Sequence, residues 1–183
     1  FQDQLWNNET GRSIGLSYFR ERGFSDETIK NFQLGYSQDG YEVFTNEALD
    51  KGYQLEYLSG VGLTKVDGNR KIDRFRGRVM FPILSHTGRV LGFGGRVLKK
   101  DAKTAKYLNS PESEIYHKSK ILYGIYQAKQ AIAKADECFL VEGYTDVISF
   151  NQAGVKNVVA SSGTALTVDQ ILLIKRFTRN ITL

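Results

Sequence analysis

The chain of 183 residues is 41% hydrophobic, carries a formal charge of +5 and contains a single cysteine. This length predicts one or two domains, and one cysteine excludes an internal disulfide or a cysteine-rich zinc cluster. The longest apolar runs, such as residues 171–174, are far shorter than the roughly 20 residues of a membrane-spanning helix, so no membrane partner is expected. Cys138 lies in an apolar run and is predicted to be a core residue, and the scarcity of cysteine favours a cytoplasmic protein.

The positive charge is concentrated in the middle of the chain. Residues 1–69 carry a net charge of −5, residues 70–120 a net +9 and residues 121–183 a net +1. In the central segment the basic residues alternate with Gly, Phe and Tyr within predicted strands. This pattern favours a phosphate-binding surface over a merely solvated one.

Short helices are predicted for the first part of the chain. One is expected over residues 12–22, ending at Gly23, and another begins at a Ser25 cap and ends at residues 34–36. Two more are predicted over residues 42–49 and 55–58.

Strands are predicted next. Residues 78–84 and 89–93 form a hairpin around a turn at 87–88, and residues 96–98 continue it. Pro82 predicts an edge or an irregularity. The glycines at 92–95 lack the spacing of a dinucleotide fingerprint and predict a bulge or a close backbone approach. Residues 106–120 are predicted to be mostly irregular before a helix over residues 119–134.

The last part of the chain alternates strands and helices. They are expected at 138–141, 145–152, 156–160, 167–177 and from 181 onward. This order predicts a parallel sheet with right-handed crossovers. The expected fold class is α/β, with an α+β N-terminal subdomain over residues 1–134 that holds a small antiparallel sheet. A parallel α/β domain follows from residue 135.

Two acids mark the first strand of this parallel sheet. Glu142 directly follows the apolar run 138–141 and precedes Gly143, and Asp146 comes four residues later. A carboxylate at the carboxyl end of such a strand is where metal-dependent phosphate chemistry takes place. The spacing of Asp146 alone favours an ordinary acid at a helix start.

The sequence VEGYTDV at 141–147, followed by ASSGTALT at 160–167, resembles the Toprim signature of bacterial DnaG-type primases. Four further blocks are similar to the same family in the same order: RFRGRVMFPI at 74–83, GRVLGFGGRVL at 88–98, KYLNSPE at 106–112 and HKSKILYG at 117–124. YFRERGF at 18–24 is similar to its opening helix. The resemblance covers nearly the whole chain, with residues 135–183 as the first half of a Toprim domain.

The resemblance implies synthesis of RNA primers on a single-stranded DNA template from nucleoside triphosphates. It makes Glu142 a catalytic, metal-binding acid for Mg²⁺ or Mn²⁺, and Asp146 the acid that supports it. It also implies binding of template and nucleotides by a set of residues in the basic segment and the opening helix: Arg22, Arg74, Arg76, Arg96, Lys106, Asn109 and Lys118.

Three family features are expected to lie outside this sequence. Zinc belongs to a module that precedes this region in the family, and an Asp-x-Asp pair follows the strand that begins at Ile181. A C-terminal region contacts the replicative helicase. The chain is therefore expected to be an excised piece that makes no primers by itself.

Two other functions are compatible with these residues. One is another Toprim enzyme, such as a topoisomerase or a nuclease, since ten tyrosines leave a tyrosine nucleophile open. The other is a single-stranded-DNA-binding module without chemistry, which the charge of residues 70–120 would suit.

Overall fold

The structure, a computed structural model, describes residues 1–99, 104–163 and 165–183. Packing divides them into two compact units. The first contains Phe1–Pro82 and Gly92–Tyr116, and the second contains Ile83–Leu91 and His117–Leu183. The division into domains at residue 134 stays a prediction, since compact units need not coincide with domains.

The first unit begins with four short helices. They are α1 (Gln2–Asn7), the π-helix η1 (Gly11–Leu16), α2 (Ser17–Glu21) and α3 (Asp26–Asn31). The predicted helix over 12–22 is thus split between η1 and α2, and α1 was not predicted. Ser25 caps α3 as expected, because its hydroxyl accepts from the Thr28 N–H at 3.1 Å.

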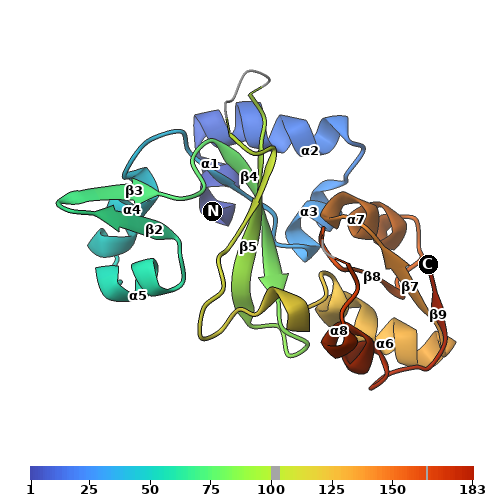
Figure 1. The fold of residues 1–183 in the computed structure, drawn as a ribbon. Coiled ribbons are helices and arrows are strands. Elements are labelled where there is room, and N and C mark those ends of the chain that lie inside the picture. The colour runs from blue at the N-terminus through green and yellow to red at the C-terminus, as the bar shows by residue number, and fades with distance from the viewer. Residues whose placement is uncertain (100–103, 164) are drawn as a thin grey trace. The chain divides into compact units, whose positions relative to one another are not determined.

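Most of a four-stranded antiparallel sheet of order β1-β4-β5-β6 belongs to this unit (Figure 1). Its strands are β1 (Gly35–Ser37), β4 (Arg78–Leu84), β5 (Val90–Val97) and β6 (Tyr107–Asn109). The prediction that residues 34–36 end a helix was wrong, because β1 pairs there with Arg78–Met80 of β4. β6 falls in the stretch predicted to be irregular and pairs with the end of β5.

Pro82 and the β5 glycines differ in part from their predictions. β4 is an interior strand, but its pairing with β1 reaches only Met80, so Pro82 lies beyond that ladder. The glycines of β5 make no tight bend. Instead, a Cβ at Gly92 would lie 2.9 Å from the Tyr116 ring, and one at Gly95 would lie 2.7 Å from the Phe75 ring. These glycines therefore admit neighbouring side chains of the protein itself.

The remaining elements of the first unit cluster at one end of it (Figure 1). They are α4 (Val43–Asp50), α5 (Leu55–Gly60) and a hairpin formed by β2 (Thr64–Asp67) and β3 (Arg70–Asp73). Both helices were predicted, whereas the hairpin was not. Asp73 joins this group together. Its buried carboxylate accepts from the Phe44 N–H at 2.7 Å, and from the Thr45 N–H at 3.0 Å and hydroxyl at 2.5 Å. Two donors of the α4 N-terminus are satisfied in this way.

The second unit is a three-layer arrangement around a parallel sheet of order β8-β7-β9. Its strands are β7 (Cys138–Val141), β8 (Val158–Ala160) and β9 (Ile181–Thr182), and its α-helices are α6 (Ile125–Ala135), α7 (Tyr144–Gln152) and α8 (Val168–Ile174). The 3-10 turn η2 (Lys118–Lys120) precedes α6. α7 covers one face of the sheet, and α6 and α8 cover the other (Figure 1). The α/β fold class and the parallel sheet are confirmed.

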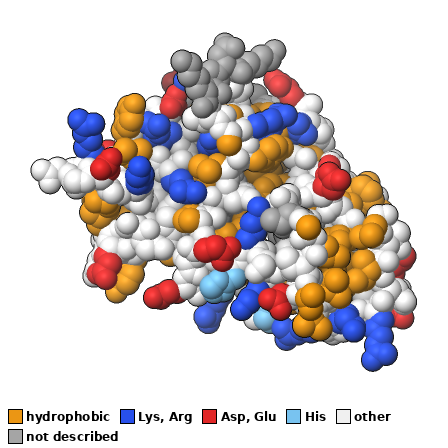
Figure 2. Space-filling view, in the orientation of Figure 1, with side chains coloured by type: hydrophobic (Ala, Val, Ile, Leu, Met, Phe, Trp, Pro, Cys, Tyr) orange, Lys and Arg blue, Asp and Glu red, His pale blue; other side chains and the backbone are white. Residues whose placement is uncertain are grey.

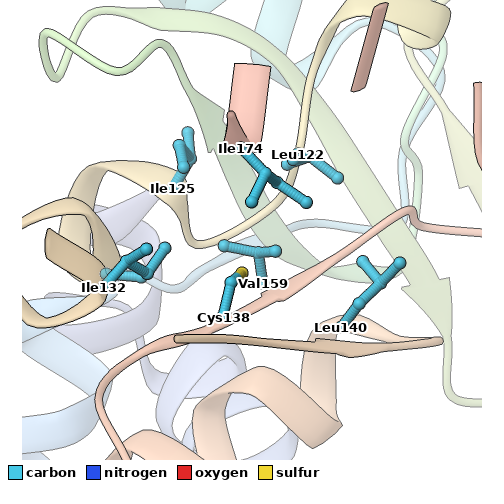
Figure 3. Close-up of a cluster of buried hydrophobic side chains, with 8 residues drawn as sticks. Leu122, Ile125, Ile132, Cys138, Leu140, Val159 and Ile174 are labelled. Atoms are coloured by element: carbon cyan, nitrogen blue, oxygen red, sulfur yellow. The ribbon is translucent and has the colours of Figure 1, made fainter. Parts of the chain in front are cut away.

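The core of this unit lies between the sheet and the α6–α8 layer (Figure 3). Cys138 and Leu140 of β7 pack there with Ile132 of α6, Val159 of β8 and Ile174 of α8. Cys138 is fully buried, as predicted, and burial raises the pKa of its thiol to about 12. It is therefore an inert packing residue.

Hydrophobic side chains also gather on the surface of the second unit (Figure 2). Val168 and Leu172, one turn apart on α8, are 72% and 53% exposed. The described part of the chain leaves this face of α8 uncovered. In the described residues we find no helix of the length and hydrophobicity needed to cross a membrane.

Candidate active site and nucleic-acid interface

Glu142 lies where the strand order of the parallel sheet reverses. It follows β7, the central strand, and is exposed. From β7 the chain passes through α7 to β8 on one side, and from β8 it passes through α8 to β9 on the other side. In open α/β sheets this switch point, at the carboxyl ends of the strands, is where ligands bind. Glu142 thus lies at the carboxyl end of β7, as the sequence predicted.

Asp146 fixes the turn that carries Glu142. Its Oδ2 accepts a hydrogen bond from the N–H of Gly143 at 3.0 Å. Gly143 is the N-cap of α7, and Asp146 occupies the third position of the helix. Because glycine has no side chain to return the bond, this is the acidic half of a capping box. Asp146 therefore holds the backbone next to Glu142 and also places negative charge at the helix N-terminus.

The donor chemistry at this turn suits a hard divalent cation. Mg²⁺ is usually bound through one or two carboxylates, with water and substrate phosphates completing its shell. Glu142 is exposed and offers such a carboxylate. Among the residues that the structure describes, no three His, Cys, Asp or Glu side chains are grouped as a complete metal site. Glu142 is thus suited to be one ligand of a shared site.

Two of the expected binding arginines meet on one tyrosine of the first unit. The Arg22 guanidinium lies 5.2 Å from the centre of the Tyr18 ring, and that of Arg96 lies 4.7 Å from it. Arg96 is also 6.0 Å from the Tyr107 ring. Burial raises the pKa of Tyr18, although Arg96 and Arg22 oppose the shift. The distances of Arg22 and Arg96 from the Tyr18 ring lie within the range of cation–π attraction, so both guanidinium groups contact this ring.

Arg96 is poorly satisfied within the described chain. Its Nε is buried, and no hydrogen-bond partner is found for it among residues 1–99, 104–163 and 165–183. A buried donor without a partner costs free energy, so Arg96 is held here by its ring contacts and not by a hydrogen bond from Nε.

The other expected binding residues lie in several settings. Arg74 donates from Nε and Nη2 to the carbonyl oxygen of Asn109, at 3.4 and 3.3 Å. Lys106 is exposed just before β6, and Arg76 stacks on Tyr41 at 4.2 Å. Lys118 belongs to the second unit, where its carbonyl oxygen accepts from Gln170 Nε2 at 3.3 Å.

The expected site residues therefore fall into two sets. Three of them, Lys118, Glu142 and Asp146, belong to the second unit. The other expected binding residues all belong to the first unit: Arg22, Arg74, Arg76, Arg96, Lys106 and Asn109. Within the first unit the structure brings Arg22 close to Arg96 and Arg74 close to Asn109.

Sequence reasoning missed Tyr18 and Arg78. The spacing of Tyr18 and Arg22, four residues apart near the end of a helix, is a local signal that could have indicated their contact. The contact of Tyr18 with Arg96 joins a helix to a distant strand, so no local signal existed for it. Arg78 is buried and donates to the carbonyl oxygens of Gly95 and Ala105, at 3.2 and 3.0 Å. It ties β4 to the segments beside it.

Comparison with known families matches both parts of the chain. The family described as "DNA primase catalytic core, N-terminal domain" matches residues 1–129, and a Toprim domain matches residues 136–183. The first match lies outside the Toprim part, so it favours a primase over the topoisomerase or nuclease alternative.

Curated relatives agree with this assignment. The DNA primase of Deinococcus radiodurans is 47% identical over 163 residues, which is 88% of this chain and 28% of the relative. The DNA primase of Escherichia coli strain K12 is 44% identical over 165 residues, 90% of this chain and 28% of the relative. The chain thus spans less than a third of the length of these relatives.

Solved structures show the same architecture. The E. coli primase catalytic core superposes with a TM-score of 0.89 at 41% identity, covering 99% of this chain and 57% of that one. A DnaG primase catalytic domain bound to single-stranded DNA gives 0.86 at 42% identity, covering 99% and 57%. The RNA polymerase domain of Mycobacterium tuberculosis primase DnaG, with a double-stranded DNA oligomer carrying an overhang, gives 0.89 at 35% identity, covering 95% and 54%. The chain belongs to the DNA primase catalytic core family.

Proposed function

We propose that this chain is part of a DNA primase that makes short RNA primers on single-stranded DNA from nucleoside triphosphates. The observation that carries the proposal is the exposed Glu142 at the switch point of the parallel sheet, on a turn fixed by Asp146. Because the chain spans 28% of its primase relatives, the activity belongs to the longer protein.

Glu142 is proposed as the catalytic acid and a ligand of Mg²⁺ or Mn²⁺, and Asp146 as its positioning residue. When bound, such an ion polarises the α-phosphorus and neutralises the pyrophosphate that leaves. β9 runs parallel beside β7, with Phe139 opposite Thr182. Carboxylates that follow this strand, as the Asp-x-Asp pair of the family does, would therefore reach the sheet edge that carries Glu142.

The basic residues are proposed to hold the template and the incoming nucleotide. The relatives in complex with DNA support a DNA ligand. Arg22 and Arg96 present two fixed guanidiniums, Lys106 is exposed nearby in sequence, and Arg74, Arg76, Asn109 and Lys118 complete the proposed set. The nucleoside triphosphates, the RNA primer, a replicative helicase and a cytoplasmic location are further expectations from the family.

Replacement of Glu142 in the full-length protein tests this function. Glu142→Gln should lower template-dependent primer synthesis at least about 100-fold, because metal-assisted charge stabilisation is worth several kcal/mol. Affinity for single-stranded DNA should stay within about twofold, since an exposed carboxylate is no phosphate ligand. The matched control is Asp169→Asn, an exposed acid in the first turn of α8 that should leave synthesis unchanged.

A binding module without chemistry is the second candidate, and the two guanidiniums stacked on Tyr18 favour it equally well. The same experiment separates the two functions. Primer synthesis that survives in Glu142→Gln would refute the catalytic assignment and leave the binding function.

A further inference from the structure

A short segment of the second unit, residues 118–124, connects η2 to the start of α6. We call it the 118–124 segment. It contacts β8, α7 and α8 at the edge of the parallel sheet that carries Glu142. This edge is where β7 and β8 end and where α7 and α8 begin.

The backbone of the 118–124 segment pairs with the end of β8. The Tyr123 N–H donates to the carbonyl oxygen of Ala160 at 2.9 Å, and the Ala160 N–H donates back to the Tyr123 carbonyl oxygen at 3.0 Å. Ala160 is the last residue of β8 and lies opposite Val141, the last residue of β7. Tyr123 therefore fixes β8 at the level where β7 passes into Glu142.

The side chain of Tyr123 contacts the turn that carries Glu142. Its ring meets the Tyr144 ring edge-to-face, with centroids 4.6 Å apart and planes at 72°. This arrangement is favourable for an aromatic pair. Tyr144 is the first residue of α7 and follows Glu142 by two residues. Tyr123 and Tyr144 are only 2% and 5% exposed, so the two rings hold each other in a packed environment.

The backbone of the 118–124 segment also lies against α7. Gly124 has a φ of +82°, and a Cβ at this position would lie 2.6 Å from Cγ1 of Val147. Glycine is the residue that allows both the left-handed conformation and this close approach. The first two turns of α7 are thus contacted by two successive residues of the segment, 123 and 124.

The other end of the 118–124 segment is fixed by the start of α8. Gln170 is fully buried, and its Nε2 donates to the carbonyl oxygens of Lys118 at 3.3 Å and Ile121 at 2.9 Å. The Thr167 hydroxyl donates to the Ser119 carbonyl oxygen at 2.5 Å. Buried hydrogen bonds of this kind are costly to break. The segment is therefore anchored at one end while its other end contacts β8 and α7.

Tyr123 has a different environment from its apolar neighbours. Leu122 and Ile125 belong to the core between the sheet and the α6–α8 layer (Figure 3), whereas the Tyr123 ring lies against Tyr144. Burial raises the pKa of Tyr123, so its hydroxyl stays protonated at neutral pH. The contact is thus made by a neutral ring, and phenylalanine should be able to make it as well.

We infer that Tyr123 is a positioning residue for Glu142, because its ring and its backbone fix the two chain segments that meet beside this carboxylate. One segment is the turn of Glu142, held through the Tyr144 ring, and the other is the end of β8, held through Ala160. A metal-binding side chain needs neighbours that keep its backbone in place. The inference rests on the proposed function for the task of Glu142.

The first test measures the turn without a metal. In the full-length protein in EDTA, amide hydrogen–deuterium exchange is followed by mass spectrometry on a peptide that spans residues 141–147. Tyr123→Leu should speed exchange of this peptide about fivefold, the effect of losing one aromatic pair. Tyr123→Phe keeps the ring and should exchange at the rate of the unchanged protein.

The second test measures the site itself, by Mn²⁺ binding and by primer synthesis. Tyr123→Leu should weaken Mn²⁺ binding about fivefold and lower kcat by about the same factor, because Glu142 is held less firmly. The affinity for a single-stranded oligonucleotide should change less than about twofold. Tyr123→Phe should restore both Mn²⁺ binding and kcat, which a role of the hydroxyl group would not allow.

Ile132→Ala is the control for a general loss of stability. Ile132 is fully buried on α6, in the core of the same unit. Its truncation should lower the free energy of unfolding and leave both the exchange of residues 141–147 and Mn²⁺ binding unchanged. Tyr144→Leu removes the same ring pair from the side of α7, and it takes the place of Tyr123→Leu if that variant does not fold.

Two results would overturn the inference and leave the proposed function intact. One is unchanged exchange and Mn²⁺ binding in Tyr123→Leu, while Glu142→Gln still abolishes primer synthesis. The other is an equal effect of Ile132→Ala on exchange of the turn. Primer synthesis that survives in Glu142→Gln would instead refute the proposed function, and the inference would fall with it.

Discussion

Replacement of Asp146 by Ala and by Asn separates a positioning role from direct contact with a metal. The structure gives Asp146 one defined task, to accept the Gly143 N–H at 3.0 Å. Alanine removes this bond and the charge at the α7 N-terminus. Loss of a capping bond costs about 1 kcal/mol, and the charge adds roughly 0.3–1 kcal/mol. Asparagine keeps an oxygen acceptor and loses only the charge.

The expected rates follow from these energies. If the whole cost of Asp146→Ala, about 1–2 kcal/mol, acts on the turn that holds Glu142, primer synthesis should fall about 5–30-fold. Asp146→Asn should fall less than about 5-fold, because only the charge term is lost. The assay is primer synthesis by the full-length protein at saturating template, with chemical denaturation to measure the free energy of unfolding.

A control and a refuting result complete the test. Asp169→Ala removes another acid from the first turn of a helix, α8, and should leave synthesis unchanged. If Asp146→Asn were as damaging as Asp146→Ala, or if either exceeded about 30-fold, the carboxylate charge itself would be needed at the reacting atoms. The positioning role would then be wrong.

Three further predictions concern the first unit. Tyr18→Leu should weaken binding of single-stranded DNA about 5-fold, by loss of about 1 kcal/mol of cation–π attraction, whereas Tyr18→Phe should not; equal anisotropy curves for both variants would contradict this. Asp73→Ala should lower the free energy of unfolding by about 3–5 kcal/mol, because buried donors such as the Thr45 hydroxyl lose a charged acceptor; a loss below 1 kcal/mol in urea unfolding would argue against it. Gly95→Val should lower the free energy of unfolding by about 1–3 kcal/mol, because the added side chain would overpack against Phe75. An unchanged unfolding midpoint would refute this close fit.

The sequence predicted the parts of the fold that local signals determine. Ser25 and Thr167 are caps whose hydroxyls accept from backbone N–H groups three residues later, and both helices begin there. The alternation of apolar strands and helices after residue 137 predicted the parallel sheet, because the buried strands are short and strongly apolar.

The missed strands depend on partners far away in the sequence. β1 and β6 have three residues each and are defined by pairing with β4 and β5. Such short segments have no periodicity of their own, so context decides their conformation. The β2–β3 hairpin carried one local signal, Gly68 after Asp67 with a φ of +58°. The strands β2 and β3 are rich in charged residues and lack the alternation of apolar and polar residues from which strands were predicted.

In the candidate site, too, the features set by neighbouring residues could be predicted and the contacts between distant segments could not. The location of Glu142 at a strand end and of Asp146 in a helix start could be predicted, because each depends on a few neighbouring residues. The stacking of Arg96 on Tyr18 could not be, because it joins α2 to β5.

The central claim is that Glu142 holds the divalent ion on which primer synthesis by the longer protein depends. Electron paramagnetic resonance measures it directly, with Mn²⁺ titrated into the full-length protein and into Glu142→Gln. We predict that Glu142→Gln weakens Mn²⁺ binding and lowers primer synthesis together, while the affinity for a single-stranded oligonucleotide stays unchanged. Unchanged Mn²⁺ binding in Glu142→Gln would contradict the claim.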